Sequence, residues 1–295
     1  MTSKKPSHIS TILNNKLSKA LENIGIEKWT PIQNAIIPFL LSNDANVIAL
    51  SKTGSGKTAS FGVPIINRIC SLKEYKKHNK PSLYSIIIAP THELCLQITN
   101  ALNDFSMYMD NISITAVYGG SDIATQIKSI KQGTDIIVAT PGRLIDIIRR
   151  KVLTLNSINT VVIDEADKMF DMGFIEEIID ILHYMPEHAN VWMFSATMQR
   201  QLKDVIEKHI TTPHIFDLSS KNILAENIEN IFFVVENQNK IEALKRIISF
   251  YPNIYAIIFC KTKKIADEVT VKLISSNYKV DALHGDLSQE QRNEV

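Results

Sequence analysis

Short apolar runs alternate along most of the chain with longer segments in which apolar residues recur at helical spacing. This alternation is typical of parallel strands joined by crossover helices. It predicts strands near residues 46–50, 84–89, 112–117, 135–139, 160–164, 190–194 and 214–218, and helices near 57–69, 92–108, 122–131, 142–150, 173–183 and 198–209. Two more helices are expected at 10–24 and 31–41, around a turn at Gly25. The first part of the chain is therefore predicted to be an α/β domain with a doubly wound parallel sheet.

A polar segment, residues 219–230, interrupts this rhythm and is predicted to be a linker. After it, the pattern predicts strands at 231–235, 255–260 and 279–283 and helices near 239–250, 262–276 and 288–295. Three strands are few for a parallel sheet covered on both faces, so we expect this second domain to be incomplete. The expected division is 1–42 as N-terminal helices of the first domain, 43–218 as its sheet, 219–230 as linker and 231–295 as a partial second domain.

The composition is that of a globular protein, with 45% apolar and 21% charged residues. Basic and acidic residues number 32 and 31, so net charge gives no evidence for a nucleic-acid partner, and any such binding must rest on a local patch. The three cysteines lack metal-binding spacing, and no apolar run is long enough for export or for a membrane span. We expect a soluble cytoplasmic protein without membrane partners, with a nuclear or nucleolar location as the alternative in a eukaryote.

Residues 51–58 follow the first apolar run and resemble a phosphate-binding loop. Gly54 and Gly56 permit close approach of backbone amides to phosphate, Lys57 supplies a positive charge, and Thr58 can bind Mg²⁺. A serine- and glycine-rich turn without a ligand is the alternative, which the preceding strand and following helix disfavour. The candidate nucleotide-binding residues are Ser51, Lys52, Thr53, Gly54, Ser55, Gly56, Lys57 and Thr58.

The tetrapeptide Asp164-Glu165-Ala166-Asp167 stands at the end of another apolar run. Asp164 is the candidate metal carboxylate, acting largely through water, and Glu165 is the candidate base or orienter of an attacking water. Asp167 can pair with another group. The alternative is a set of solvated loop acids, which is disfavoured because a phosphate-binding loop lies upstream. Together the two motifs predict an ATPase or related nucleotide hydrolase.

These motifs belong to an ordered series that occupies residues 25–33, 89–94, 119–120, 140–143, 164–167, 195–197, 258–262, 284–286 and 289–292. The series resembles that of the DEAD-box ATP-dependent RNA helicases over nearly the whole chain. The resemblance implies a RecA-like first domain, an incomplete second RecA-like domain, ATP and Mg²⁺ as cofactors, and RNA as partner. It further implies that hydroxyls of Ser195 and Thr197 bond Asp167 and couple hydrolysis to domain movement. An N-cap of the following helix is the other role open to these hydroxyls, and the two roles are compatible.

Adenine selection is assigned by the same resemblance to Gln33, whose carboxamide matches the donor and acceptor that adenine presents. Without the family context, Gln33 would be an ordinary helix glutamine. The position that stacks on adenine in the family corresponds to His8, and histidine offers less stacking area than a larger aromatic ring. The implied catalytic set is Lys57, Asp164, Glu165, Asp167, Ser195 and Thr197.

RNA contact is implied for segments that grip the backbone of a single strand without reading bases. The family's motif Ia has an arginine where this chain has His92, so one fixed positive charge is mostly absent at neutral pH. RNA affinity is expected to be weaker, or more sensitive to pH, as a result. The candidate RNA-binding residues are Pro90, Thr91, Gly119, Gly120, Thr140 and Arg143, followed by Thr262, Gly285 and Gln289.

Two later motifs of the family, Ala-Arg-Gly-x-Asp and His-Arg-x-Gly-Arg-x-x-Arg, do not occur in these 295 residues. In the family the second supplies an arginine finger, which contributes ~10³ to 10⁵ in rate in related systems. We therefore expect this chain alone to bind ATP weakly with little turnover. The favoured hypothesis is a fragment of a longer RNA helicase, ahead of a natural truncated RNA-binding regulator. A DNA helicase or small-molecule kinase fits the motifs poorly.

Overall fold

The structure, a computed structural model, describes residues 9, 12–76, 80–109, 111–219, 229, 231–251 and 253–295, without the side chains of residues 76, 200, 201, 289 and 293. The chain forms two compact units, Met1–Ile223 and Leu224–Val295. Among the described helices, none combines the length and apolarity that crossing a membrane requires.

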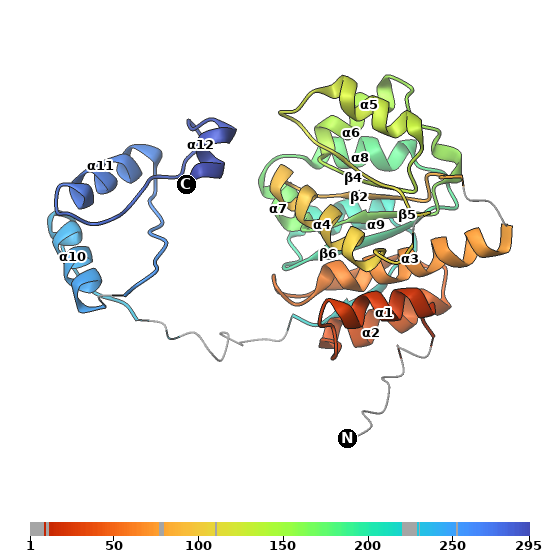
Figure 1. Cartoon of the computed structure of the whole chain (residues 1–295), viewed down its shortest axis with the longest axis horizontal. Helices are drawn as coiled ribbons and strands as arrows, with labels where there is room; N and C mark the ends of the chain where they lie inside the picture. Colours follow the sequence, from red (N-terminus) through yellow and green to blue (C-terminus); the bar gives the residue numbers. More distant parts are fainter. Residues whose placement is uncertain are drawn as a thin grey trace. The chain divides into compact units, whose positions relative to one another are not determined.

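The first unit contains a seven-stranded sheet in the order β3-β4-β2-β5-β6-β1-β7. Figure 1 labels its strands β2, β4, β5 and β6 among the helices of this unit. Its strands are β1 (Val47–Leu50), β2 (Ser85–Ile88), β3 (Ile114–Val117), β4 (Ile136–Ala139), β5 (Thr160–Ile163), β6 (Asn190–Ser195) and β7 (His214–Asp217). All pairings are parallel. The predicted strands and the doubly wound parallel sheet of this unit are thus confirmed.

Helices cover both faces of this sheet because strand side chains point alternately to opposite sides. Val47 and Ala49 of β1 join a core with helices α1 to α4, whereas Ile48 and Leu50 join a second core with α5 to α9. The helices are α1 (Asn15–Asn23), α2 (Pro31–Ser42), α3 (Lys57–Lys76), α4 (His92–Phe105), α5 (Ile123–Gln132), α6 (Pro141–Arg149), α7 (Ala166–Asp171), α8 (Ile175–Tyr184) and α9 (Arg200–His209), with a short 3-10 turn at Leu155–Ser157. The alternation of side chains along each strand therefore supplies both cores, one on each face of the sheet.

Several helix starts carry side-chain caps that the sequence supplies locally. Thr30 and Gln33 form a reciprocal capping box at α2, with Pro31 at the first helical position. Thr91 accepts a hydrogen bond from Leu94 N at the start of α4. These caps fix where each helix begins after its strand.

The region after β5 differs from the prediction of a single helix at 173–183. It contains two helices, α7 and α8, separated near Gly173, whose φ is +84°. The first of them begins at Ala166, inside the acidic tetrapeptide. Six residues are too few to show helical spacing in the sequence. Contacts with β6 and α9 support this short helix in the fold.

The second unit contains the predicted helices, as α10 (Lys240–Phe250), α11 (Lys263–Ile274) and α12 (Gln289–Glu294), preceded by a 3-10 turn at Asn237–Asn239. The predicted strands at 231–235, 255–260 and 279–283 are wrong, because none of these described residues is in a strand. A strand exists only when a neighbour satisfies its backbone groups, and an apolar pattern alone does not supply one. Their side chains are largely exposed, for instance Phe232 at 87% and Phe259 at 93%.

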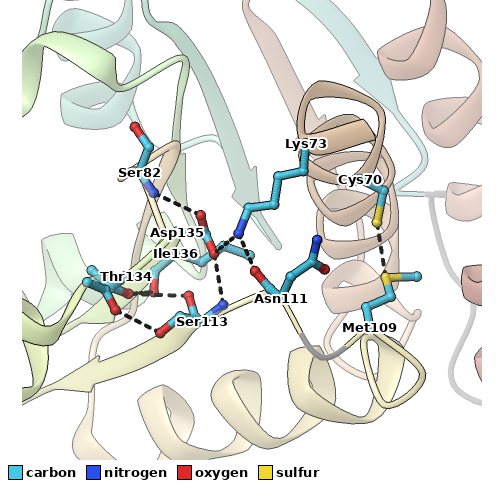
Figure 2. A network of polar contacts seen from close by, with 10 residues as sticks. Cys70, Lys73, Ser82, Met109, Asn111, Ser113, Thr134, Asp135 and Ile136 are labelled. Carbon is cyan, nitrogen blue, oxygen red and sulfur yellow. Dashed lines mark hydrogen bonds and ion pairs between the residues drawn. The ribbon is translucent and has the colours of Figure 1, made fainter. Parts of the chain in front are cut away.

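At the amino edge of the sheet, one buried ion pair ties several segments together (Figure 2). Lys73 Nζ of α3 lies 2.7 Å from Asp135 Oδ2, just before β4, and also donates to the carbonyl of Asn111. Asp135 further accepts from the backbone N–H groups of Ser82 and Ser113, at 3.0 and 2.9 Å. The network fixes the starts of neighbouring strands, at the edge opposite to their carboxyl ends.

Candidate functional site

The predicted nucleotide-binding segments follow three neighbouring strands of the sheet. The phosphate loop follows β1, the acidic tetrapeptide follows β5, and Ser195 ends β6, which lies between them. Because all three strands are parallel, these segments meet at the carboxyl edge. Ligands of open α/β sheets bind at this edge.

The phosphate loop closes on itself between β1 and α3. Gly54 and Gly56 have φ of +78° and +91°, in the left-handed region that glycine tolerates. Ser51 and Ser55 hydroxyls lie 2.8 Å apart. Lys57 is only 7% exposed, and its Nζ donates to the Ser51 carbonyl at 3.2 Å. The loop therefore holds a buried ammonium inside a curve of backbone.

Gln33 reaches the same loop from α2. Its Oε1 accepts from Thr30 N at 2.8 Å, and its Nε2 donates to the Gly56 carbonyl at 3.1 Å. A Cβ at position 56 would collide with this carboxamide, so glycine is needed there for space as well as for φ. One amide hydrogen and one lone pair of the carboxamide remain beyond these two bonds. The predicted contact with adenine would use them.

Asp164 carries a buried carboxyl group directly after β5. It is 3% exposed, and its Oδ1 accepts from Glu165 N at 2.9 Å. Burial raises the pKa of Asp164 to about 6, although the positive charge of Lys57 acts in the opposite direction. The site therefore contains a buried carboxylate whose negative charge the protein compensates incompletely.

Glu165 adopts an unusual backbone conformation, with φ of +52° and ψ of +49°. This left-handed geometry is costly for a residue with a side chain and is typical of functional sites. The Glu165 carboxylate lies 2.8 Å from Lys168 Nζ, one turn further along α7. The left-handed turn and the pair with Lys168 thus set the position of the Glu165 carboxylate at the end of the strand.

Asp167 is joined to β6 and the segment that follows it. Its Oδ2 accepts from both the backbone N–H and the hydroxyl of Thr197, each at 3.0 Å. Ser195 Oγ accepts from Asp167 N at 3.3 Å and donates to the Thr197 carbonyl at 2.7 Å. The expected contact of the two hydroxyls with Asp167 is present, and the alternative N-cap role is wrong, because α9 begins later, after Gln199.

The predicted RNA-facing segments follow three further neighbouring strands, β3, β4 and β2. Pro90 and Thr91 follow β2, Gly119 and Gly120 follow β3, and Thr140 follows β4. Pro90 is buried, whereas both glycines are exposed. The nucleotide-side and RNA-side segments thus occupy adjacent halves of one carboxyl edge.

Arg143 points toward the protein rather than standing free. Its Nη1 donates to Gln126 Oε1 at 2.9 Å and its Nη2 to the Ser121 carbonyl at 3.1 Å. Gln126 Nε2 donates in turn to the Tyr118 carbonyl and to Ser121 Oγ, at 3.1 and 2.5 Å. His92 stacks on Tyr118 with ring centroids 4.1 Å apart. This stacking connects the hydrogen-bonded group of Arg143, Gln126, Ser121 and Tyr118 to α4.

Sequence reasoning missed Gln126, Ser121 and Tyr118. The available signal was weak: Gln126 shares the buried face of α5 with Ile130, four residues on, and a polar residue on such a face invites an explanation. The prediction for His8 lies outside the described residues.

The predicted RNA residues of the second unit lie around two helix starts. Thr262 caps α11 by accepting from Ile265 N at 3.3 Å. The Gly285 carbonyl accepts from Arg292 Nη2 at 3.1 Å. Gln289 begins α12, and its side chain lies outside the described part of the chain.

Comparison with known proteins agrees with this arrangement. Residues 30–205 match the DEAD/DEAH box helicase family, and residues 239–295 match the helicase conserved C-terminal domain. DEAD-box ATP-dependent RNA helicase CshA of Bacillus subtilis is 38% identical over 281 residues, which are 95% of this chain and 55% of that protein. ATP-dependent RNA helicase CshA of Listeria monocytogenes is also 38% identical, over 96% of this chain and 53% of its own length.

Solved structures show the same likeness. A DEAD box protein of Methanococcus jannaschii has a TM-score of 0.65 at 34% identity, covering 96% of this chain and 74% of that one. Dbp5 of S. cerevisiae, bound to RNA and ADP BeF3, has a TM-score of 0.83 at 27% identity, covering 98% of this chain and 72% of that one.

The sheet and its carboxyl-edge motifs define a RecA-like protein with a phosphate-binding loop. More narrowly, the chain belongs to the DEAD/DEAH box helicase family. It spans about half the length of the relatives from Bacillus and Listeria that it matches.

Proposed function

We propose that this protein is an ATP-dependent RNA helicase, which couples RNA-stimulated ATP hydrolysis to local opening of RNA duplexes. The observation that carries the proposal is the shared carboxyl edge: nucleotide-side segments follow β5, β6 and β1, and RNA-side segments follow β3, β4 and β2. The likeness to Dbp5 bound to RNA and ADP BeF3 supports it. Helicase activity is proposed for the whole protein, since these residues cover about half of its relatives.

ATP is expected to bind with its phosphates in the loop of residues 51–58. Lys57 Nζ would give up its hydrogen bond to the Ser51 carbonyl and donate to phosphate oxygens instead. The loop conformation at Gly54 and Gly56 would let backbone amides point toward the same phosphates. Gln33 would select adenine through the remaining donor and acceptor of its carboxamide. ATP should therefore be preferred over GTP.

The residues at the end of β5 fit a Mg²⁺ ion. Asp164 is a buried carboxylate whose raised pKa reflects poor compensation of its charge, which a divalent cation would favour. Thr58 supplies a second oxygen ligand at the start of α3. A Mg²⁺ held by Asp164, largely through water, and Thr58 would neutralise charge on the phosphates.

Glu165 is proposed to orient the attacking water and accept its proton. Its carboxylate follows Asp164 on a left-handed turn and pairs with Lys168 Nζ at 2.8 Å. Through its hydrogen bonds with Thr197 and Ser195, Asp167 would transmit a change at the ATP site to the end of β6. This is the proposed coupling between hydrolysis and movement.

RNA is expected to bind by its backbone, independently of sequence, through Thr91, Gly119, Gly120 and Thr140 in the first unit. Thr262, Gly285 and Gln289 are proposed contacts in the second. We propose that the protein acts in the cytoplasm, a location that agrees with its three free cysteines.

The proposal is tested first by calorimetric titration of the 295-residue chain with ATP and Mg²⁺. Lys57→Met should weaken ATP binding by more than about tenfold, because a charge-assisted contact to phosphate contributes about 1.5–3 kcal/mol. Lys131→Met, at an exposed position of α5, is the matched control and should bind like the wild type.

Unwinding is tested with the whole protein by release of a labelled strand from a short RNA duplex. Release should require ATP and should be lost in Glu165→Gln, although that variant still binds ATP. Equal binding of ATP by wild type and Lys57→Met, or strand release that ignores ATP, would contradict the proposal.

A further inference from the structure

Gln126 lies where the RNA-facing segments of the first unit meet, although it belongs to none of them. It is on α5 and only 8% exposed. Its carboxamide makes three hydrogen bonds, donating to the Tyr118 carbonyl and Ser121 Oγ and accepting from Arg143 Nη1. Such a buried, well-satisfied amide specifies a single arrangement of the groups around it.

The loop that follows β3 is held on both sides of its two glycines. Gln126 binds the Tyr118 carbonyl before them, and Arg143 Nη2 binds the Ser121 carbonyl after them. Between these anchors, Gly120 has φ of +86° and no Cβ neighbour within 4 Å. Because glycine restricts its own backbone so little, the positions of the Gly119 and Gly120 amides depend on these two hydrogen bonds.

The same cluster reaches the segment that follows β2. Tyr118 stacks on His92, with an angle of 29° between the rings, and His92 is the first residue of α4 after Thr91. Arg143 lies in the first turn of α6, which follows Thr140. The three RNA-facing segments are therefore joined through one glutamine side chain and its partners.

We propose that Gln126 is a positioning residue for RNA binding, which holds the 118–121 loop and Arg143 in the arrangement that accepts the RNA backbone. The inference rests on the proposed RNA function. Arg143 acts here largely through the protein, since two of its guanidinium nitrogens donate to Gln126 and Ser121. RNA affinity should thus depend on a side chain that does not touch RNA.

The test is fluorescence anisotropy of a labelled single-stranded oligouridylate, titrated with the 295-residue chain in Mg²⁺ and a non-hydrolysable ATP analogue. Gln126→Met keeps the volume and removes all three hydrogen bonds, so RNA binding should weaken about tenfold. Gln132→Met is the matched control, because Gln132 ends the same helix and is exposed. Its RNA affinity should equal that of the wild type.

Three readouts separate positioning from direct contact or general damage. In Gln126→Met the slope of log affinity against log salt should stay unchanged, whereas loss of a phosphate contact would reduce it by about 0.7. ATP affinity should also stay unchanged. In the free protein, the NMR order parameters of the Gly119 and Gly120 amides should fall, because the loop loses its anchors.

Two further variants keep the proposal open to contradiction if Gln126→Met folds poorly. Ser121→Ala removes the hydroxyl that accepts from Gln126 Nε2 and donates to the Tyr118 carbonyl, and it should weaken RNA binding a few-fold. Arg143→Met combined with Gln126→Met should weaken binding no more than the stronger single change, because both act on one loop.

The outcomes distinguish this inference from the proposed function. If the wild type does not bind RNA, the proposed function fails and this inference fails with it. If the wild type binds RNA and both Gln126→Met and Ser121→Ala bind equally well, the positioning role alone is overturned. A reduced salt slope in Gln126→Met would also overturn it, in favour of direct phosphate contact.

Discussion

At the scale of single residues, the candidate ATP site carries a cost in stability that its chemistry explains. Asp164 is buried beside Lys57, and burial raises its pKa to about 6. A group that is harder to ionise in the folded state binds protons more tightly there than in the unfolded chain. This carboxylate, which we propose to hold Mg²⁺, therefore destabilises the metal-free fold at neutral pH.

We predict that Asp164→Asn stabilises the metal-free protein at pH 7, by about 3 kcal/mol as an order of magnitude. Between the unfolded pKa of about 4 and the folded pKa of about 6, the native state binds more protons than the unfolded state, so wild-type stability falls as pH rises through this window. The asparagine variant does not ionise, and its advantage should appear across the same window. Urea unfolding in EDTA from pH 4 to 7 measures the difference.

Asp104→Asn, at an exposed position of α4, is the control and should show no comparable trend with pH. An Asp164→Asn advantage that is absent at pH 7, or equally large at pH 4, would contradict the assignment of the destabilisation to a buried charge.

The residues of this site differ in how well the sequence alone predicts them. Lys57 and Asp164 were predictable because consecutive neighbours form a recognisable spacing after a strand. Gln126 was not, because its role arises from Tyr118 and Arg143, eight and seventeen residues away, which meet it only when β3 and β4 pair. The turn at Glu165 likewise depends on contacts that no local pattern encodes.

At the scale of elements, the two edges of the sheet have different tasks. The carboxyl edge carries the loops of the candidate site, whereas the amino edge is fixed by the Lys73–Asp135 pair in Figure 2. That pair is buried, with side-chain exposure of 8% and 1%. Breaking a buried pair leaves an uncompensated charge, which is far costlier than losing a surface pair.

We predict that Lys73→Met lowers the free energy of unfolding by about 3–5 kcal/mol, because Asp135 keeps only its backbone donors Ser82 and Ser113. The double variant Lys73→Met with Asp135→Asn should lose less than the sum of the two single losses. Urea unfolding followed by circular dichroism measures all three.

Arg149→Met serves as the comparison, since Arg149 pairs with Asp180 at the surface with 62% and 47% exposure. Its loss should stay below about 1 kcal/mol. Equal losses for Lys73→Met and Arg149→Met would show that burial of the pair contributes nothing.

The strands β1, β2, β4 and β5 were predictable because each is buried on both faces and reads as a continuous apolar run. The same kind of run at 255–260 misled, since residues there such as Tyr255 and Ile257 are exposed at 102% and 82% and pair with no strand among the described residues. An apolar run shows that a segment could be buried. Whether another element covers that segment depends on the tertiary structure.

At the scale of the whole molecule, the two units differ in how they are stabilised. Both hydrophobic cores consist of residues between Ile9 and Ile210, all in the first unit. In the second unit Leu273 is the buried apolar residue among those described, and large side chains such as Phe232 and Phe259 are exposed. We therefore expect the stability of the first unit not to depend on the residues of the second unit.

We predict that residues 1–219 expressed alone unfold in urea at the same midpoint as the 295-residue chain, within about 0.5 kcal/mol of stability. The two tryptophans, Trp29 and Trp192, make this measurable, because both lie in the first unit and tryptophan fluorescence reports that unit in either protein. The longer chain should bind more of the apolar dye ANS, since it adds exposed aromatic and aliphatic side chains. A lower midpoint for residues 1–219 would mean that the second unit supports the first core, and equal ANS binding would mean that its apolar segments are covered in solution.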